Sequence, residues 1–303
     1  MAKINVVIAG SIGLDTVKTP FGSSENEIGG SGTFSSIACS IFTRPALLGI
    51  IGNDFPREKL SVLESKGVDL SALQESEKSN MRWKAHYDFD VNTAHTDSFE
   101  ANAFADLKPE LPENMLGAEF ISLGNWFPEK QIQFLKLFKK KPLVSIGDTI
   151  QYYIDNYRPQ VMEMIRESSM PLLNDGEARQ LFNTNNLSKA GKEILKLNSK
   201  YAIIKKGDNG CVMFSHKKHF SCPGYPLDNV VDPTGCGDSF AGALLGYLAK
   251  TRDLSEKNMR KAIVVASAVA SFNAESYSYY KLAEITRKDV SERVKELKEI
   301  AKF

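Results

Sequence analysis

The sequence predicts an α/β fold in which a mostly parallel sheet is covered by helices on both faces. Two observations lead to this prediction. Short, predominantly apolar stretches alternate along the chain with longer stretches of helical periodicity, and these short stretches lack the polar alternation of half-exposed strands. No internal repeat or linker-like composition interrupts the pattern, so we expect a single domain over residues 1–303.

The elements follow in chain order. The predicted strands are Asn5–Ala9, Pro142–Ile146, Met170–Leu173 and Tyr201–Ile204. The predicted helices are Phe34–Phe42, Glu129–Lys140, Pro159–Glu167, Leu187–Leu197, Gly237–Leu248, Asn258–Ala270 and Val290–Ala301. Ligands of such open sheets bind beyond the carboxyl ends of the strands, so functional residues are expected directly after these strands.

One segment has a different period. Between Arg82 and Val91, aromatic and aliphatic residues alternate with polar ones, which is typical of a half-exposed antiparallel strand. The turn formers in Asn92–His95 lead into a partner strand that we expect to run to about Phe104. Such a hairpin lies beside the main sheet, and it is either a lid over an active site or an edge hairpin that only packs.

The composition argues against several partners. With 38 Lys+Arg against 37 Asp+Glu the net charge is +1, so neither nucleic acid nor a membrane surface is a predicted partner. The longest apolar runs are far shorter than a membrane span, and the first residues lack a signal-peptide pattern. The 4 cysteines do not suggest a disulfide framework. We expect a cytoplasmic protein.

The segment Asp232–Gly242 carries the strongest chemical signal. Gly235 and Gly237 let successive N–H groups point into one concavity, and a slim helix follows at once. Backbone donors at the N-terminus of a helix bind anions. Asp238 lies inside this anion site, where a carboxylate is not expected for stability. A base beside a phosphate-sized hole predicts phosphoryl transfer to a hydroxyl group.

Two weaker signals lie near the N-terminus. Asp15 follows the first strand, where ligands of α/β sheets bind, although such a residue is also common as a helix cap. Gly29 and Gly30 precede an apolar helix and allow a ligand to approach the backbone, with the hydroxyl of Thr33 nearby. A glycine-rich turn without a ligand fits the same residues.

Two further segments follow predicted strands. Asn174 and Glu177 open a helix after Met170–Leu173, and they are either ligands of a hydrated Mg²⁺ or a capping pair. Lys205 begins a turn that contains Gly207 and Gly210, where lysine side chains either attract nucleotide phosphates or are simply solvated.

The cluster Cys211, His216, His219 and Cys222 has the ligand types of a zinc site. We nevertheless reject zinc, because the segment is predicted to be a hairpin that turns at Lys217-Lys218. If the two histidines are paired across it, the strand alternation places them on one face and the cysteines on the other.

These motifs together resemble the ribokinase-like (PfkB) carbohydrate kinases. Asp232–Gly242 resembles the C-terminal signature of that family, Gly29-Gly30 its di-glycine, and Asn174-x-x-Glu177 its Asn-x-x-Glu motif. The resemblance implies a three-layer α/β/α sandwich with a small β-strand lid, built here from segments near 12–19 and 82–104. It also implies a kinase that uses ATP and Mg²⁺ and, as in many members, K⁺.

The resemblance also implies roles for individual residues. Asp238 is the expected general base, and the amides of Gly235, Cys236 and Gly237 are the expected anion hole. The residues expected to bind the substrate are Asp15, Gly29, Gly30, Thr33 and Asn125. Those expected to bind the nucleotide are Asn174, Lys205, Gly207, Gly210, Thr234 and Ser267, and those expected at metal ions are Asn174, Glu177 and Asp232.

Departures from the family pattern affect the identity of the substrate. Lys205-Lys206-Gly207 replaces the usual Thr-x-Gly of the nucleotide-side turn, and Ser267 stands where ribokinase-type members have Asn. We favour a sugar kinase that phosphorylates a hydroxymethyl group, with an adenosine-like nucleoside kinase as the alternative. A ligand sensor without turnover is a weaker alternative, since Asp238 and its loop are intact. A dinucleotide-dependent oxidoreductase fits poorly, because the first turn lacks a full Gly-x-Gly-x-x-Gly.

Aromatic residues of the predicted lid add three hypotheses. Trp83, Tyr87, Phe89 and Phe104 would stack on a nucleobase, cover a hydrophobic cavity, or pair lid to lid in a homodimer.

Cys236 places a thiol at the N-terminus of a helix, an environment expected to lower its pKa and to make it sensitive to alkylation. A buried, inert cysteine is the alternative.

Overall fold

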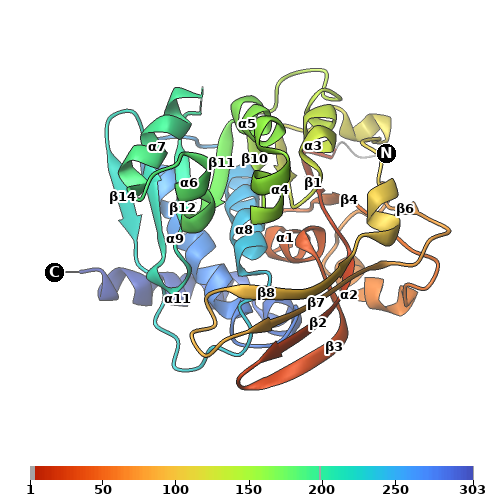
Figure 1. Cartoon of the computed structure of the whole chain (residues 1–303). Coiled ribbons are helices and arrows are strands. Elements are labelled where there is room, and N and C mark those ends of the chain that lie inside the picture. The colour runs from red at the N-terminus through yellow and green to blue at the C-terminus, as the bar shows by residue number, and fades with distance from the viewer. Residues whose placement is uncertain (1–3, 198, 303) are drawn as a thin grey trace.

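The structure, a computed structural model, describes residues 4–197 and 199–302. Its centre is an eight-stranded sheet with the order β14-β13-β12-β11-β10-β9-β1-β4 (Figure 1). The six strands from β12 to β4 are parallel to their neighbours, whereas β13 and β14 are antiparallel, so the predicted mostly parallel sheet is confirmed. The strands are β1 (Val6–Ala9), β4 (Ala46–Leu48), β9 (Phe120–Leu123), β10 (Val144–Gly147), β11 (Met170–Asn174), β12 (Ala202–Lys205), β13 (Cys211–Phe214) and β14 (His219–Cys222).

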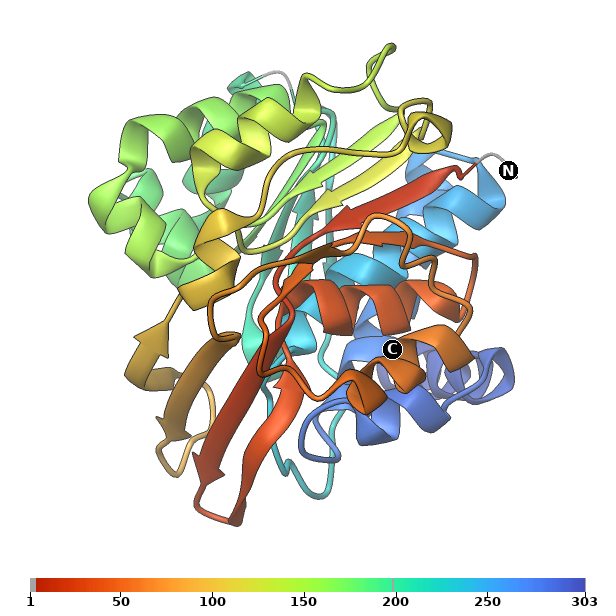
Figure 2. The same cartoon turned by 90° about the vertical axis from the view of Figure 1, so that its right-hand side faces the viewer.

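Helices cover both faces of this sheet (Figure 2). Successive strand residues point to opposite faces: Ile8 belongs to one hydrophobic core and Val7 to the other. The first core lies under α1 (Ser31–Ser40), α2 (Ser61–Ser65), α8 (Cys236–Thr251), α9 (Glu256–Asn273), α10 (Tyr280–Glu284) and α11 (Arg287–Ile300). The second lies under α3 (Pro128–Leu135), α4 (Gln151–Asn156), α5 (Arg158–Glu167), α6 (Asp175–Leu181) and α7 (Leu187–Lys196). The three predicted layers are therefore present.

A separate four-stranded sheet, the lid, projects from this body (Figures 1 and 2). Its order is β3-β2-β7-β8, with β2 (Gly13–Thr19), β3 (Gly22–Gly29), β7 (Met81–Tyr87) and β8 (Ala94–Glu100). The β7–β8 hairpin is antiparallel as predicted, while β2 and β7 pair in parallel. Both predicted lid segments belong to it, and β3 is a strand that the sequence pattern did not reveal.

One predicted lid residue is not in the lid. β8 ends at Glu100, and Phe104 lies in a short 3₁₀ helix (Asn102–Asp106), buried in the second core of the main body. The prediction that Phe104 belongs to the lid is therefore wrong. The two-residue period that we extended to about Phe104 ends with the strand itself.

The remaining short elements connect these parts. They are the strand pair β5 (Ile50–Ile51) and β6 (Gln74–Glu75) and the 3₁₀ helices Arg57–Leu60, Glu113–Met115 and Gly207–Asn209. The predicted helix Glu129–Lys140 ends earlier, at Leu135, although Phe138 beyond it is still buried against Phe134. None of the helices within the described ranges combines the length and the apolar character that crossing a membrane requires.

The register of β13 and β14 corrects one detail of the cysteine–histidine hairpin. Cys211 is opposite Cys222, and His219 is opposite Phe214 rather than His216, which lies in the connecting turn. Alternation along β14 still separates His219 from Cys222. His219 thus lies on the opposite face of the hairpin from Cys211 and Cys222.

Candidate active site

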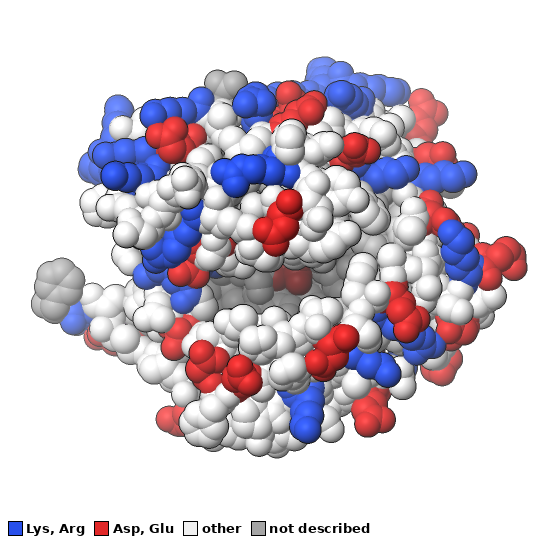
Figure 3. Space-filling model, viewed as in Figure 1, with Lys and Arg blue, Asp and Glu red and all other residues white. Residues whose placement is uncertain are grey.

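The predicted site residues meet where the carboxyl ends of the parallel strands face the lid. The space-filling view shows the surface hollowed between the lid and the main body, with acidic atoms visible inside (Figure 3). This is the position at which open α/β sheets bind ligands. The lid adds a second wall to this edge of the sheet.

The loop before α8 has the backbone geometry of an anion site. Gly235 is the N-cap of α8, with φ +77°. A β-carbon at this position would overlap the ring of Phe34, so the left-handed conformation and the close packing both require glycine. The amide of Cys236 donates to the carbonyl of Pro233 at 3.1 Å and closes the turn. The amides of Gly235 and Gly237 make no such backbone bond among the described residues, which leaves them for an anion.

Asp238 lies in the first turn of α8, directly after these amides. Its backbone carbonyl accepts a hydrogen bond from Ser35 Oγ at 3.0 Å, which ties α8 to α1. Burial and the nearby charge of Asp148 raise the pKa of Asp238 to about 7, and Lys205 acts in the opposite direction. A carboxylate that titrates near neutral pH is suited to general base catalysis.

Asp15 lies on the lid strand β2 and faces the same loop. Burial raises its pKa to about 7, an effect opposed by a hydrogen bond from the Gly30 amide. A β-carbon at Gly29 would overlap the Asp15 carboxylate, so this glycine makes room for the acid. Asp15 Oδ1 is buried without a hydrogen-bond partner among the described residues. It lines a small cavity of about 10 Å³ that Asp232 and Thr234 also line.

Asn174 and Glu177 form a capping box at the start of α6. Asn174 Oδ1 accepts from the amide of Glu177, and Glu177 Oε2 accepts from the amide of Asn174, both at 2.8 Å. The capping interpretation is therefore realised. It leaves the metal interpretation open, because the buried Glu177 carboxyl still faces Asp148, Lys205 and Asp238. Burial is the main cause that raises the pKa of Glu177 above its usual range, and the nearby charge of Asp148 adds to it.

Asp148 is a site residue that the sequence did not reveal. It directly follows β10, and its Oδ2 lies 3.4 Å from Lys205 Nζ at the end of β12. Asn174 ends β11, which lies between these two strands, and Glu177 follows it in α6. The rule that functional residues follow strands could have indicated Asp148, but no motif spacing separates it from an ordinary turn residue.

The group formed by Asp148, Glu177, Asp238 and Lys205 has an excess of negative charge when its carboxyls are ionised. Oxygen donors with net negative charge fit a hydrated Mg²⁺, which keeps several of its waters. Among the described residues, no three His, Cys, Asp or Glu side chains are arranged to hold an ion directly. A magnesium ion would therefore contact these residues largely through its waters and ATP phosphates.

Comparison with known proteins identifies the family. The model of the pfkB family carbohydrate kinases matches residues 15–285. The chain belongs to this family. It is therefore a kinase, a phosphotransferase with an alcohol group as acceptor.

Individual proteins are similar to this PfkB-family chain in sequence or in structure. A cytidine kinase of Thermococcus kodakarensis is 26% identical over 84% of this chain and 91% of its own length. A probable fructokinase-3 of Arabidopsis thaliana is 32% identical, but over 37% of this chain and 33% of its own length. The solved structure of a Burkholderia thailandensis nucleoside kinase with inosine has a TM-score of 0.81 at 18% identity, covering 96% of this chain and 98% of that one. The last likeness supports the fold.

Two other residues of this PfkB kinase that are predicted to bind the substrate differ in whether their side chains are free to form hydrogen bonds with it. Thr33 Oγ1 donates to the Gly29 carbonyl at 2.7 Å and so supports the di-glycine turn. Asn125 follows β9 at the carboxyl edge, and its Oδ1 is buried without a partner among the described residues. Asn125 therefore has an unused acceptor for a substrate hydroxyl, whereas the Thr33 proton is already engaged.

The predicted nucleotide residues lie along the turn after β12 and on α9. Gly207 and Gly210 have φ values of +57° and +74° and shape this turn. The lid tip reaches it, because a β-carbon at Gly207 would lie 2.9 Å from Asn92 Oδ1. Ser267 Oγ lies 3.9 Å from Cys211 Sγ, behind the turn. The lid therefore reaches the turn that is predicted to bind the nucleotide, in addition to carrying Asp15.

Thr234 connects the anion-hole loop to two other parts of the molecule, the lid and α9, and also bonds within the loop. Its Oγ1 lies 3.1 Å from the hydroxyl of Tyr87, which is on the lid strand β7. Its amide donates to Asp232 Oδ1 at 2.9 Å, and its carbonyl accepts from Asn273 Nδ2 at 2.6 Å. Asn273, which is fully buried on α9, was not indicated by the sequence.

Asp232 is also compatible with the predicted monovalent cation. It is buried, and burial raises its pKa against hydrogen bonds from Thr234 and Ser278. No lysine or arginine of the described chain is among the groups that act on its pKa. A buried carboxylate without a basic partner fits a cation held beside the loop.

The predicted low pKa of Cys236 is wrong. Burial raises the pKa of this thiol to about 12, and the charges of Asp232 and Asp238 act in the same direction. Its Sγ lies 3.4 Å from the Ala270 carbonyl and 3.6 Å from Asn273 Nδ2, packed against α9. The effect of burial on this thiol therefore outweighs any effect of the helix N-terminus. With this pKa the thiol is protonated at neutral pH, as expected for the alternative of an inert cysteine.

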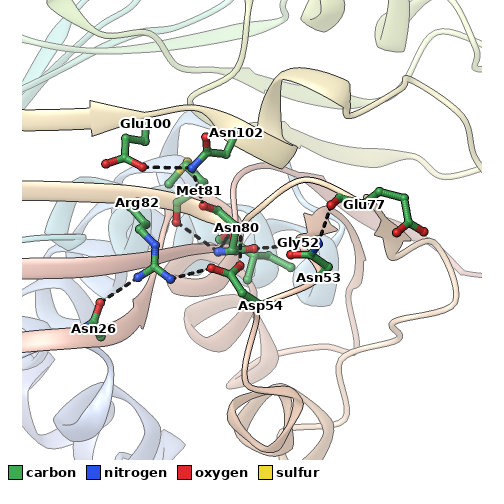
Figure 4. A network of polar contacts seen from close by, with 11 residues as sticks. Asn26, Gly52, Asn53, Asp54, Glu77, Asn80, Met81, Arg82, Glu100 and Asn102 are labelled. Carbon is green, nitrogen blue, oxygen red and sulfur yellow. Dashed lines mark hydrogen bonds and ion pairs between the residues drawn. The ribbon is translucent and has the colours of Figure 1, made fainter.

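A polar network fixes the base of the lid to the main body (Figure 4). The fully buried Asn80 precedes β7; its Oδ1 accepts from the Gly52 amide at 2.9 Å and its Nδ2 donates to the Ile12 carbonyl at 3.1 Å. Asp54 accepts from the Asn80 amide at 2.6 Å and from Arg82 at 2.7 Å. The lid thus starts from a rigid base, which helps to hold Asp15 opposite the catalytic loop.

Proposed function

We propose that this chain transfers the γ-phosphate of ATP to the hydroxymethyl group of a small sugar, with Asp238 as the general base. The observation that carries the proposal is the position of Asp238. It lies partly exposed in the first turn of α8, directly after the free amides of Gly235 and Gly237, and its pKa is raised to about 7. A base and an anion site on adjacent residues suit in-line attack of a hydroxyl on a phosphoryl group.

The other residues position the two reactants. Asp15, Gly29, Gly30 and Asn125 would bind substrate hydroxyls, with Thr33 supporting the di-glycine turn. Lys205, Gly207, Gly210, Thr234 and Ser267 would line the nucleotide site. A hydrated Mg²⁺ near Asn174 and Glu177 would neutralise phosphate charge, and K⁺ near Asp232 would support the loop.

A nucleoside is the second candidate substrate. The cytidine kinase matches 84% of this chain, whereas the fructokinase match covers 37%. A nucleoside and a free sugar present the same hydroxymethyl group to Asp238, so the catalytic residues are common to both. The lid, which carries Asp15 and the partly exposed Trp83, decides whether a base is accommodated.

We also propose that two copies pair through their lids. β8 is an edge strand of the lid and is exposed along nearly its whole length. Large apolar side chains are exposed on the lid at Phe21, Phe89 and Phe99. Sedimentation of the wild type and of Phe99→Ser tests this: a wild-type monomer at micromolar concentration would contradict the proposal.

The substrate is tested by measuring ADP release with Mg-ATP and a panel of ribose, fructose, other ketoses and nucleosides. We expect turnover with at least one sugar or nucleoside, and the ratio of kcat/KM between a nucleoside and its free sugar decides between the candidates. ATP binding without ADP release across the panel would contradict the proposal and favour a ligand sensor.

A further inference from the structure

The side chain of Lys205 is a largely buried cation with unused hydrogen-bonding capacity. It ends β12 opposite Asn174 of β11, and it is 16% exposed. Its ammonium makes one hydrogen bond among the described residues, to Asp148 Oδ2 at the long distance of 3.4 Å. An ammonium has three donors. Two of them therefore remain for a ligand in the hollow.

The ammonium lies against the anion-hole loop. A β-carbon on Gly237 would be 3.0 Å from Lys205 Nζ. The charge of Asp238 also acts on Lys205, and that of Lys205 on Asp238. A phosphoryl group held by the Gly235 and Gly237 amides, within reach of the base, therefore lies within reach of this ammonium as well.

The surroundings keep Lys205 charged. Burial acts to lower its pKa, but Asp148, Glu177 and Asp238 outweigh burial and raise the pKa above its usual range. Lys205 is thus a fixed positive charge rather than a proton donor. Asp148 is only 11% exposed and makes the single hydrogen bond that orients this charge.

We propose that Lys205 is a catalytic residue that contacts the phosphoryl group in transfer, and that Asp148 is its positioning residue. The acceptor oxygen bonds to the γ-phosphorus as the bond to the bridging oxygen breaks. The hydroxyl proton passes to Asp238, and the electron pair of the broken bond leaves with ADP. Lys205 exchanges no proton; it offsets the charge on the transferred oxygens together with the Gly235 and Gly237 amides.

This inference rests on the proposed function. It adds a residue, Lys205, whose positive charge stabilises the transition state of the proposed phosphoryl transfer. Lys205→Met keeps the chain length and removes the charge. We expect kcat to fall about 10³-fold, as for loss of one oxyanion donor, while the Kd for ADP changes less than about threefold. Lys196→Met is the control for loss of a lysine charge, because Lys196 is exposed on α7, where it pairs with Glu193, and it should leave both constants unchanged.

A thiophosphoryl donor distinguishes contact from a structural role. The wild type should prefer ATP over its γ-thio analogue, because an ammonium binds oxygen better than sulfur. In Lys205→Met this preference should shrink. An unchanged preference would mean that Lys205 only shapes the loop, which would overturn the proposal.

Folding is controlled with a second variant. Lys205→Met leaves Asp148 buried without its partner, so Lys205→Met/Asp148→Asn, which replaces the pair by neutral groups, is measured alongside. Either folded variant with wild-type kcat would overturn the role of Lys205. An equal loss of kcat and of ADP affinity would do the same, because it indicates ground-state binding.

Asp148→Asn tests the positioning residue. We expect kcat to fall about tenfold at saturating Mg²⁺. Full recovery at higher Mg²⁺ would instead make Asp148 a metal-site residue and overturn its positioning role. A wild type that shows no ADP release across the panel would overturn the proposed function itself, whereas an active wild type with an active Lys205→Met overturns only this inference.

Discussion

The two sides of the site, which we assign to the nucleotide and to the substrate, are stabilised in different ways. On the nucleotide side, Asp148 and Lys205 lie at the ends of β10 and β12. Glu177 lies in the first turn of α6, just after the intervening β11, and Asp238 lies at the start of α8. Each of these carboxyls acts on Lys205, and the group is held by the main sheet. Interacting charges on rigid elements fix the geometry of the reaction.

The substrate side has no such pairing. The groups that set the pKa of Asp15 are burial, the Gly30 amide, Asp232 and Asp238, and none of them is basic. Asp15 Oδ1 and Asn125 Oδ1 are both buried without partners in the part of the chain that the structure describes. Unsatisfied buried acceptors are costly, and substrate hydroxyls would satisfy them. We therefore expect this side to discriminate between substrates, and the other side to perform the same chemistry on each of them.

The largest expected effect is on the charged side. Asp238→Asn keeps the shape of the side chain but removes the base, so we expect kcat to fall at least about 10³-fold. The Kd for ATP should change less than about threefold, because the amides of Gly235 and Gly237 are untouched. Kinetics and ATP titration of the purified variant measure both. Turnover within tenfold of the wild type would show that another group takes the proton.

Asp15→Asn tests the unpaired side. Loss of charged hydrogen bonds to substrate hydroxyls should raise the substrate KM about 100-fold, while the KM for ATP stays within about threefold. Asp97→Asn is the matched control, because Asp97 is an exposed lid carboxylate paired with His86. Parallel changes in both KM values for Asp15→Asn would contradict the division of the site into two sides.

The same contrast explains what the sequence could predict. The glycines at 235 and 237 and the acid at 238 are close in sequence, so their spacing alone indicates a phosphate loop. Asp148 and Lys205 lie 57 residues apart and come together only because β10 and β12 flank β11. No local sequence pattern indicates that these two side chains are close together. The prediction of a low pKa for Cys236 was wrong for a similar reason. The helix N-terminus can be recognised in the sequence, but the packing of the thiol against α9 cannot.

The substrate side is harder still to read from sequence. Asp15 is brought to the loop by the lid, whose strands come from two distant segments and include the unpredicted β3. Alternation identified the β7–β8 hairpin, but it could not show where β8 ends or that Phe104 belongs to the main core. We expect recognition of the substrate to depend on how the lid packs, and this packing cannot be predicted from a short sequence motif.

The pH dependence of catalysis involves both sides at once. Asp15 and Asp238 each have a pKa of about 7, so each is protonated, and inactive in its role, below that pH. We therefore expect log kcat/KM to rise with pH with a slope approaching two below about pH 6, and to level off above about pH 8. Asp15→Asn should reduce the slope to one. A wild-type slope of one would mean that only one of the two acids must be ionised.

The smallest expected effect concerns the contact that joins the two sides. The hydroxyl of Tyr87 on the lid bonds to Thr234 Oγ1 on the anion-hole loop, at 3.1 Å and in a buried position. Tyr87→Phe keeps the ring and removes this bond, so we expect a loss of about 1 kcal/mol in unfolding free energy and a fall in kcat/KM of about fivefold. Tyr225→Phe, which removes an exposed hydrogen bond to Glu296, is the control for the chemical change alone. If the lid positions the substrate independently of the loop, Tyr87→Phe will lose stability but keep the wild-type kcat/KM. That result would separate the two sides completely.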